Sequence, residues 1–139
     1  MTYATQTDLI TAFGEDELID LTDPSAGVVD AAKVTHKLED AEAVINAHLS
    51  ERYTLPLSET PAILRKISCD IARYYLHQGD GLNPTEEVKD NFNGAIKMLD
   101  KICQGKISLG IAQNTASERG KVEISGSAKT FTEDLLKGY

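Results

Sequence analysis

Cys69 and His77 are the residues whose types could supply a nucleophile and its base. Both fall in a stretch with helical periodicity. A helix rises about 1.5 Å per residue, so the two backbones are expected about 12 Å apart. This separation is too large for a thiolate–imidazole pair, which requires hydrogen-bonding contact. We therefore expect Cys69 to pack as a small apolar group and His77 to lie at the surface.

Two groups of residues have the types that bind metal ions. The stretch DPSAGVVD, residues 23–30, resembles a calcium loop, but valine stands at Val28 and Val34, where such a loop requires glycine and glutamate. His36, Glu39 and Asp40 share one face of a predicted helix, but that face is charged throughout, as is typical of a solvated surface. We predict no metal, cofactor or catalytic residue.

The common catalytic and nucleotide-binding motifs are absent: GxxxxGK[ST], GxGxxG, HExxH and GxSxG do not occur. Lys66, Arg73 and His77 form a basic stripe near two tyrosines, but Asp70 interrupts it. Nucleic-acid surfaces normally carry continuous basic stripes in a basic domain. The sequence therefore favours neither an enzyme nor a sequence-specific nucleic-acid binder.

The composition suits one folded domain that carries an uneven charge. The chain has 139 residues, 41% of them hydrophobic, and a formal net charge of −8. Residues 1–60 hold 12 acidic and 3 basic side chains, whereas residues 61–139 hold 10 and 11. The acidic half would repel duplex DNA and suits a basic partner. No apolar run reaches the length of a membrane helix and no signal peptide is recognisable, so we expect synthesis in the cytoplasm.

The hydrophobic periodicity predicts an all-α fold, a small bundle of about four to five helices. Thr5 and Asp8 suggest a capping box, Gly14 a stop, and Asp30 the cap of a long helix. The helix from Pro61 is apolar on most of its circumference, so we expect it at the centre of the bundle. The predicted helices cover about 6–13, 15–21, 31–52, 61–77 and 84–104, with Thr60 capping the fourth and Asn83 the fifth.

The connection ERYTLPLSETP, residues 51–61, alternates apolar side chains with small or rigid ones. Pro56 forces an extended backbone on the residue before it, so Tyr53, Leu55 and Leu57 can face one way along a hook. Such a hook would cap the core between two antiparallel helices. The alternative is that these three residues contact a neighbouring subunit.

The chain changes character after Gly105, becoming rich in Gly, Ser and Thr. We divide it into a helical core domain, residues 1–107, and an extended C-terminal arm, residues 108–139. An arm without a core of its own is either disordered or held by a partner, and apolar residues at its tip favour the second. A short strand is predicted near Val122. The candidate partner-binding residues are Val122, Ile124, Phe131, Leu135, Leu136 and Tyr139.

Several segments carry a resemblance to the phage Mu gp36-like family of Mu-like phages and prophages. They are YATQTDLITAFGEDELIDLTD, DAEAVINAHLSERYTLPL, CDIARYYL and GKISLG, which together extend to about Gly110. The family resembles in turn the helical head–tail adaptors of tailed phages. The resemblance implies a ring, dodecameric in such adaptors, that lies beneath the portal and docks on it through the C-terminal arm.

The resemblance, together with the C-terminal arm, implies a structural virion protein, a head–tail adaptor or neck subunit, and we expect neither enzymatic activity nor a cofactor. Its partners would be other copies of itself, the portal and the next neck or tail protein, in a virion assembled in the host bacterium's cytoplasm. One alternative is a transient, chaperone-like assembly protein with the same arm. Another is a small enzyme with a minimal Cys–His or metal site.

Overall fold

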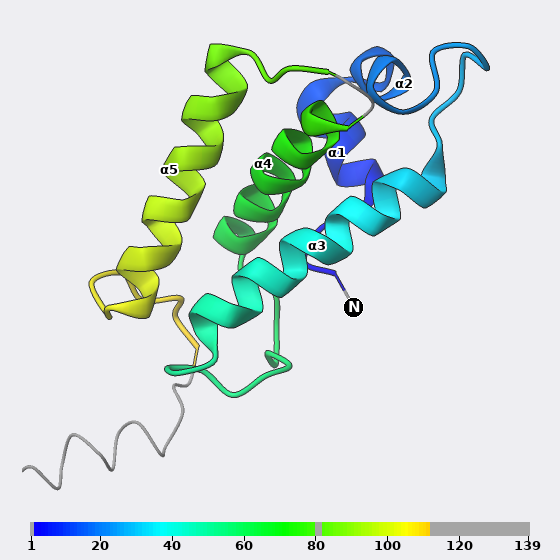
Figure 1. Ribbon diagram of the computed structural model, residues 1–139. Coiled ribbons are helices and arrows are strands. Elements are labelled where there is room, and N and C mark those ends of the chain that lie inside the picture. The colour runs from blue at the N-terminus through cyan, green and yellow to red at the C-terminus, as the bar shows by residue number, and fades with distance from the viewer. Residues whose placement is uncertain (1, 80–81, 112–139) are drawn as a thin grey trace, which may run out of the picture.

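The computed structural model describes residues 2–79 and 82–111, and within them the chain is a bundle of five helices (Figure 1). No strand occurs in these two ranges, and the fold confirms the predicted all-α class. The strand predicted near Val122 lies outside the described residues. The helices are α1 (Gln6–Phe13), α2 (Glu15–Thr22), α3 (Ala31–Leu49), α4 (Ala62–Gln78) and α5 (Glu86–Cys103).

Helix α4 is the centre of the bundle, as its nearly continuous apolar circumference predicts. It packs against all four other helices, and α3 and α5 lie on either side of it (Figure 1). The long helix α3 contributes the stripe that its periodicity predicts, and every member of that stripe is buried. Its members are Val34, Leu38, Ala41, Ile45 and Leu49.

Three of the five helices begin with a side-chain cap. The Thr5 hydroxyl accepts from the Asp8 N–H while the Asp8 carboxylate accepts from the Thr5 N–H, which completes the predicted capping box of α1. Asp30 caps α3 as predicted. The prediction for α5 is wrong: the cap is Thr85, not Asn83, because the Thr85 hydroxyl reaches the Val88 N–H at the start of the acidic first turn.

The boundaries around residues 50–62 also differ from the prediction. Helix α3 ends at Leu49 rather than near Arg52. Helix α4 begins at Ala62, and Pro61 is its N-cap in an extended conformation without a side-chain cap, so Thr60 does not cap this helix. The bond between Leu55 and Pro56, inside this connection, is cis.

The end of α5 follows the glycine signal in the sequence. Gly105 has φ +82°, which favours glycine, and the Lys106 and Gly105 N–H groups donate back to the carbonyls of Lys101 and Ile102. This pair of bonds is the Schellman arrangement that satisfies the last carbonyls of a helix. Gly94, in the middle of α5, faces open space, so no close backbone approach within the described chain explains it.

The packed core continues beyond α5 into the segment that follows it. Leu109 is 9% exposed and belongs to the core cluster, while Ile107 and Ile111 pack against that cluster. Residues 107–111 are therefore part of the bundle although they are not helical. No helix among the described residues has the length and hydropathy needed to cross a membrane.

Candidate functional site

The hook between α3 and α4 packs on its own chain. Tyr53 is 1% exposed, and its hydroxyl accepts a hydrogen bond from the Leu109 N–H at 3.2 Å. Leu55 and Leu57 are half-buried against the core, while Thr54 and Ser58 are exposed, so the predicted alternation is confirmed. Because Tyr53 is buried within the chain, it offers no side-chain surface to another subunit. The side chains of Leu55 and Leu57 remain partly exposed to solvent.

Arg52, the neighbour of Tyr53, also contacts the chain across the bundle, at the end of α5. Its Nε donates to the Cys103 carbonyl at 3.1 Å. Its guanidinium also covers Gly105, where an added Cβ would lie 2.9 Å from Arg52 Cζ. The Arg52–Tyr53 pair, which lies within one of the segments that carry the family resemblance, therefore fixes the path of residues 103–109.

The described chain ends at Ile111, directly after this anchored segment. The arm residues expected to bind partners lie outside the described residues, so the structure shows nothing of their conformation. They are Val122, Ile124, Phe131, Leu135, Leu136 and Tyr139. The point from which the chain continues toward them is nevertheless defined.

A polar cluster joins α2 to α4. The Arg73 guanidinium donates to both carboxylate oxygens of Glu17, at 2.6 and 3.0 Å, and lies 4.2 Å from the centre of the Phe13 ring. His77 Nε2 lies 3.7 Å from the same carboxylate, and within the described part of the chain it has no hydrogen-bond partner. The side chains of Arg73 and His77 are only 11% and 14% exposed. The prediction of a surface imidazole at His77 is therefore wrong.

The stripe Lys66, Asp70, Arg73 and His77 is not an open basic surface, because only Lys66 is exposed and the other three side chains are largely buried. Asp70 is buried and accepts from Lys66 Nζ at 2.8 Å, and Arg73 is held by Glu17. The role of Glu17 was not predicted from the sequence. Glu17 lies 56 residues before Arg73 in the sequence. The one signal in the sequence was that α2 is acidic whereas the stripe on α4 contains cationic residues without an evident partner.

The thiol of Cys69 is unsuited to nucleophilic chemistry. Burial raises its pKa to about 11, and the nearby Asp8 and Asp70 carboxylates act in the same direction. A thiol with this pKa is almost wholly protonated at neutral pH, and the thiolate is the reactive form. His77, the only base considered for it, is directed at Glu17.

The residues considered as metal ligands have other roles or lie apart. The Asp23 carboxylate accepts from the Ala26 N–H, and Asp30 caps α3. His36 and Asp40 are exposed, with His36 Nε2 3.9 Å from the Asp40 carboxylate. Within residues 2–79 and 82–111, no three side chains of the metal-binding types come together.

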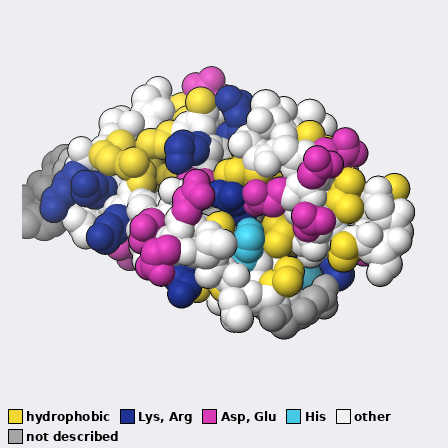
Figure 2. All heavy atoms as spheres, turned by 90° about the horizontal axis from the view of Figure 1, so that it is seen from above, with side chains coloured by type: hydrophobic (Ala, Val, Ile, Leu, Met, Phe, Trp, Pro, Cys, Tyr) yellow, Lys and Arg dark blue, Asp and Glu magenta, His cyan; other side chains and the backbone are white. Residues whose placement is uncertain are grey.

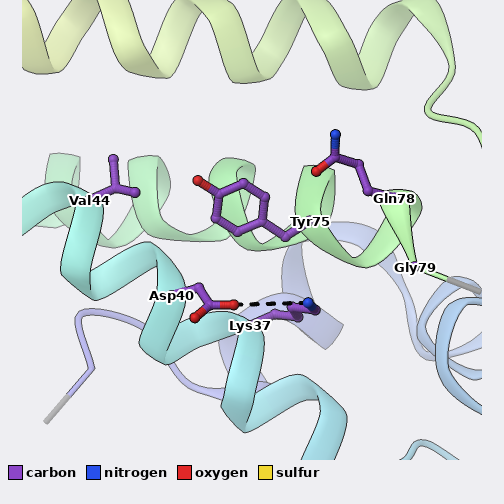
Figure 3. Close-up of a pocket in the computed structure, with 6 residues that line it drawn as sticks. All are labelled: Lys37, Asp40, Val44, Tyr75, Gln78 and Gly79. Atoms are coloured by element: carbon purple, nitrogen blue, oxygen red, sulfur yellow. Dashed lines mark ion pairs between the residues drawn. The ribbon is translucent and has the colours of Figure 1, made fainter.

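Two surface hollows accompany α4. One lies between α3 and α4, measures about 330 Å³, and is lined by Tyr75, Val44, Asp40 and Lys37 (Figure 3). Burial raises the pKa of Tyr75, and Asp40 and Tyr74 add to the effect. The sticks in Figure 3 show Asp40 directed toward Lys37, with the nitrogen 3.9 Å from the carboxylate, and no pair of catalytic groups converges here.

The second hollow is a groove of about 540 Å³ along α1 and α4. Ala12, Phe13 and Ala62 give it an apolar lining, and Arg65 and Lys66 stand on its α4 wall. Asn91 of α5 also lines the groove. A groove of this size with mixed lining suits a peptide segment better than a small molecule, which needs deeper enclosure.

Charge is distributed unevenly over the surface. Residues 1–32 contain seven acidic side chains and neither lysine nor arginine. Figure 2 shows acidic side chains across the centre, right and lower left of the face seen from above, with Lys and Arg side chains at its left end and also near its centre. Opposite charges on different parts of one molecule favour contact between different faces of neighbouring copies.

Comparison with known proteins finds relatives that cover most of the chain. Residues 3–125 match the family described as Bacteriophage Mu, Gp36. The chain is 38% identical over 119 residues to the Mu-like prophage FluMu protein gp36 of Haemophilus influenzae, covering 84% of this chain and 82% of the relative. It is 32% identical to Gene product J of Escherichia phage Mu, covering 100% of this chain and 99% of the relative. The chain belongs to the bacteriophage Mu Gp36 family.

Proposed function

We propose that this chain is a structural virion protein, a subunit of the head–tail adaptor ring in the neck of a Mu-like phage. The observation that carries the proposal is the anchoring of residues 103–109 by Arg52 and Tyr53. A rigid bundle with a defined point of departure for its C-terminal segment is what a docking arm requires. Membership of a phage protein family supports the same role.

In this proposal the residues after Ile111 dock on the portal. A fully extended chain spans about 3.3–3.6 Å per residue, so this segment could reach about 90 Å from the bundle. Val122 and Ile124 would add a strand to an exposed sheet edge of the portal, since main-chain hydrogen bonds tolerate variation in partner sequence. Four apolar residues would then fill pockets, as buried anchors dominate interface energy. They are Phe131, Leu135, Leu136 and Tyr139.

The proposed role needs neither catalysis nor a cofactor. The protonated thiol of Cys69 and the engagement of His77 with Glu17 support a purely structural protein. The ring would form from several copies of the chain, dodecameric by analogy with other adaptors. It would lie between the portal and the next neck or tail protein, after synthesis in the host cytoplasm.

Removal of residues 112–139 tests the proposal in a phage that encodes this chain. We expect the truncated protein to fold but to leave filled heads and free tails unjoined, as seen by electron microscopy of lysates. Replacing Phe131, Leu135 and Leu136 by serine should have the same effect, whereas serine at Thr132 and Lys137 should not. Normal joining by the truncated chain would overturn the proposal. Absence of the chain from purified virions would instead support a transient assembly protein.

A further inference from the structure

The loop between α2 and α3 projects from the bundle yet is firmly held. The Thr22 hydroxyl accepts from the Asp30 N–H at 3.0 Å and donates to the Leu18 carbonyl at 2.7 Å, which ties both ends of the loop together. Within the loop, the Asp23 carboxylate accepts from the Ala26 N–H at 3.1 Å. The loop therefore presents its side chains in one arrangement.

Val28 is the apolar tip of this loop. It is 57% exposed, and the only other large hydrophobic side chain described as exposed is Leu82, at 38%. Its neighbour Val29 packs against the core, so Val29 and not Val28 attaches this part of the loop to the bundle. Because the loop is already held in one arrangement, inserting this valine into a partner would cost little ordering of the loop.

The groove along α1 and α4 provides an apolar lining and one exposed positive charge. Its lining includes Ala12, Phe13 and Ala62, which would accept an apolar side chain. Two carboxylates also line it, but Asp8 caps α1 and Asp70 accepts from Lys66. Arg65 is exposed on the wall, and among the described residues it forms no ion pair. The surface beside the loop is acidic, with exposed Asp16 and Asp20 on α2. Charge complementarity therefore points to a second copy of the chain as the occupant.

The loop projects away from the helices that form the groove. In Figure 1 it lies at the upper right of the molecule, beyond α2, whereas α1 and α4, which supply most of the groove lining, lie nearer the centre. A contact between two different surfaces is heterologous, and it generates a ring when the rotation between successive copies closes.

We propose that the α2–α3 loop of one copy inserts Val28 into the α1–α4 groove of the next copy. Arg65 of the copy that carries the groove would then face the acidic α2 surface of the copy that supplies the loop. The proposal rests on the ring assembly of the proposed function and names the surfaces that form it. It identifies the partner as a second copy of this chain.

Site-specific photo-crosslinking in phage-producing cells tests this contact. p-Benzoylphenylalanine replaces Ala26, which is exposed and leaves Val28 intact. Illumination should yield a dimer of the chain whose crosslinked peptide contains residues 8–13 or 62–70. Adding Val28→Asp, or Arg65→Glu, should abolish most of the dimer. The matched controls are Leu82→Asp and Lys97→Glu. Each changes an exposed residue, one apolar and one basic, that does not line the groove, so the crosslinked dimer should form as before.

The outcomes separate this contact from the adaptor role. Crosslinking to another surface or to another protein, or no crosslink at all, overturns the loop-in-groove contact even when the chain is present in purified virions. If the chain is missing from virions, the adaptor role fails, and the same illumination of the unassembled protein in the lysate still decides the contact. A probe at Asn83 that gave the same groove peptide would overturn it as well.

Discussion

The Tyr53 hydroxyl accepts the Leu109 N–H at 3.2 Å, across a separation of 56 residues in the sequence. The bond joins the hook between α3 and α4 to the segment that leads toward the C-terminus. Because Tyr53 and Leu109 are both buried, no water competes for this donor. The proposed docking arm therefore begins from a fixed position on the bundle.

Replacing Tyr53 with phenylalanine should loosen this segment without unfolding the helices. The change keeps the packed ring but leaves a buried N–H without a partner, at a cost of about 1–3 kcal/mol. We expect amide hydrogen exchange at residues 107–111 to accelerate while exchange within α4 changes little. Tyr74→Phe is the matched control, since no hydrogen bond of that hydroxyl occurs within the described residues. Unchanged exchange at Leu109 would show that the bond does not anchor the segment.

Glu17→Gln should weaken the attachment of α2 to α4. The variant removes the charge that pairs with both Arg73 nitrogens, and because Glu17 is 27% exposed we expect a loss of about 1–2 kcal/mol in the free energy of unfolding. Urea denaturation measures it. Glu15→Gln, an exposed acid in the same turn, should change stability by less than about 0.5 kcal/mol. Equal effects of the two substitutions would contradict a specific role for the pair.

Alkaline pH should destabilise the fold through Cys69. Its pKa is raised from 9.0 to about 11 in the folded chain, so between these values the unfolded state releases the proton first. The free energy of unfolding must then fall as pH rises from about 9 toward 11, by about 1–3 kcal/mol from this group. Cys69→Ala should flatten the fall and Cys103→Ala should not. Rapid alkylation of Cys69 in the native protein at neutral pH would contradict the raised pKa.

Truncation after Ile111 and truncation after Lys106 should have different consequences for folding. The first keeps every described core residue, so helical circular dichroism and the unfolding midpoint should persist. The second removes Ile107, Leu109 and Ile111, and loss of the buried Leu109 side chain alone should cost about 2–5 kcal/mol. If both chains had the same stability, residues 107–111 would not belong to the core.

Local sequence signals predicted most of the fold because they act within a few residues. The apolar stripe of α3, the capping box of Thr5 and Asp8 and the glycine at the end of α5 each depend on neighbours along one helix. The misplaced start of α5 shows the limit of this reasoning. Asn83 and Pro84 resemble a helix start, but the hydroxyl of Thr85 supplies the cap.

Contacts between distant segments could not be read from the sequence. The pairing of Glu17 with Arg73 and of Tyr53 with Leu109 depends on how the helices pack, which no local pattern specifies. The hook was predicted to cap the core, and it does so. Its hydrogen bond to the segment after α5 could not be predicted from the sequence and is seen only in the structure. The partner-binding residues predicted in the arm remain predictions, since they lie outside the described residues.

A density map of the neck of an intact virion tests the central claim most directly. The account predicts a ring of copies of this five-helix bundle beneath the portal. In each copy, residues after Ile111 should run from the Tyr53–Leu109 anchor to the portal surface. A neck whose density is fully explained by other proteins, with no copy of this bundle, would contradict it.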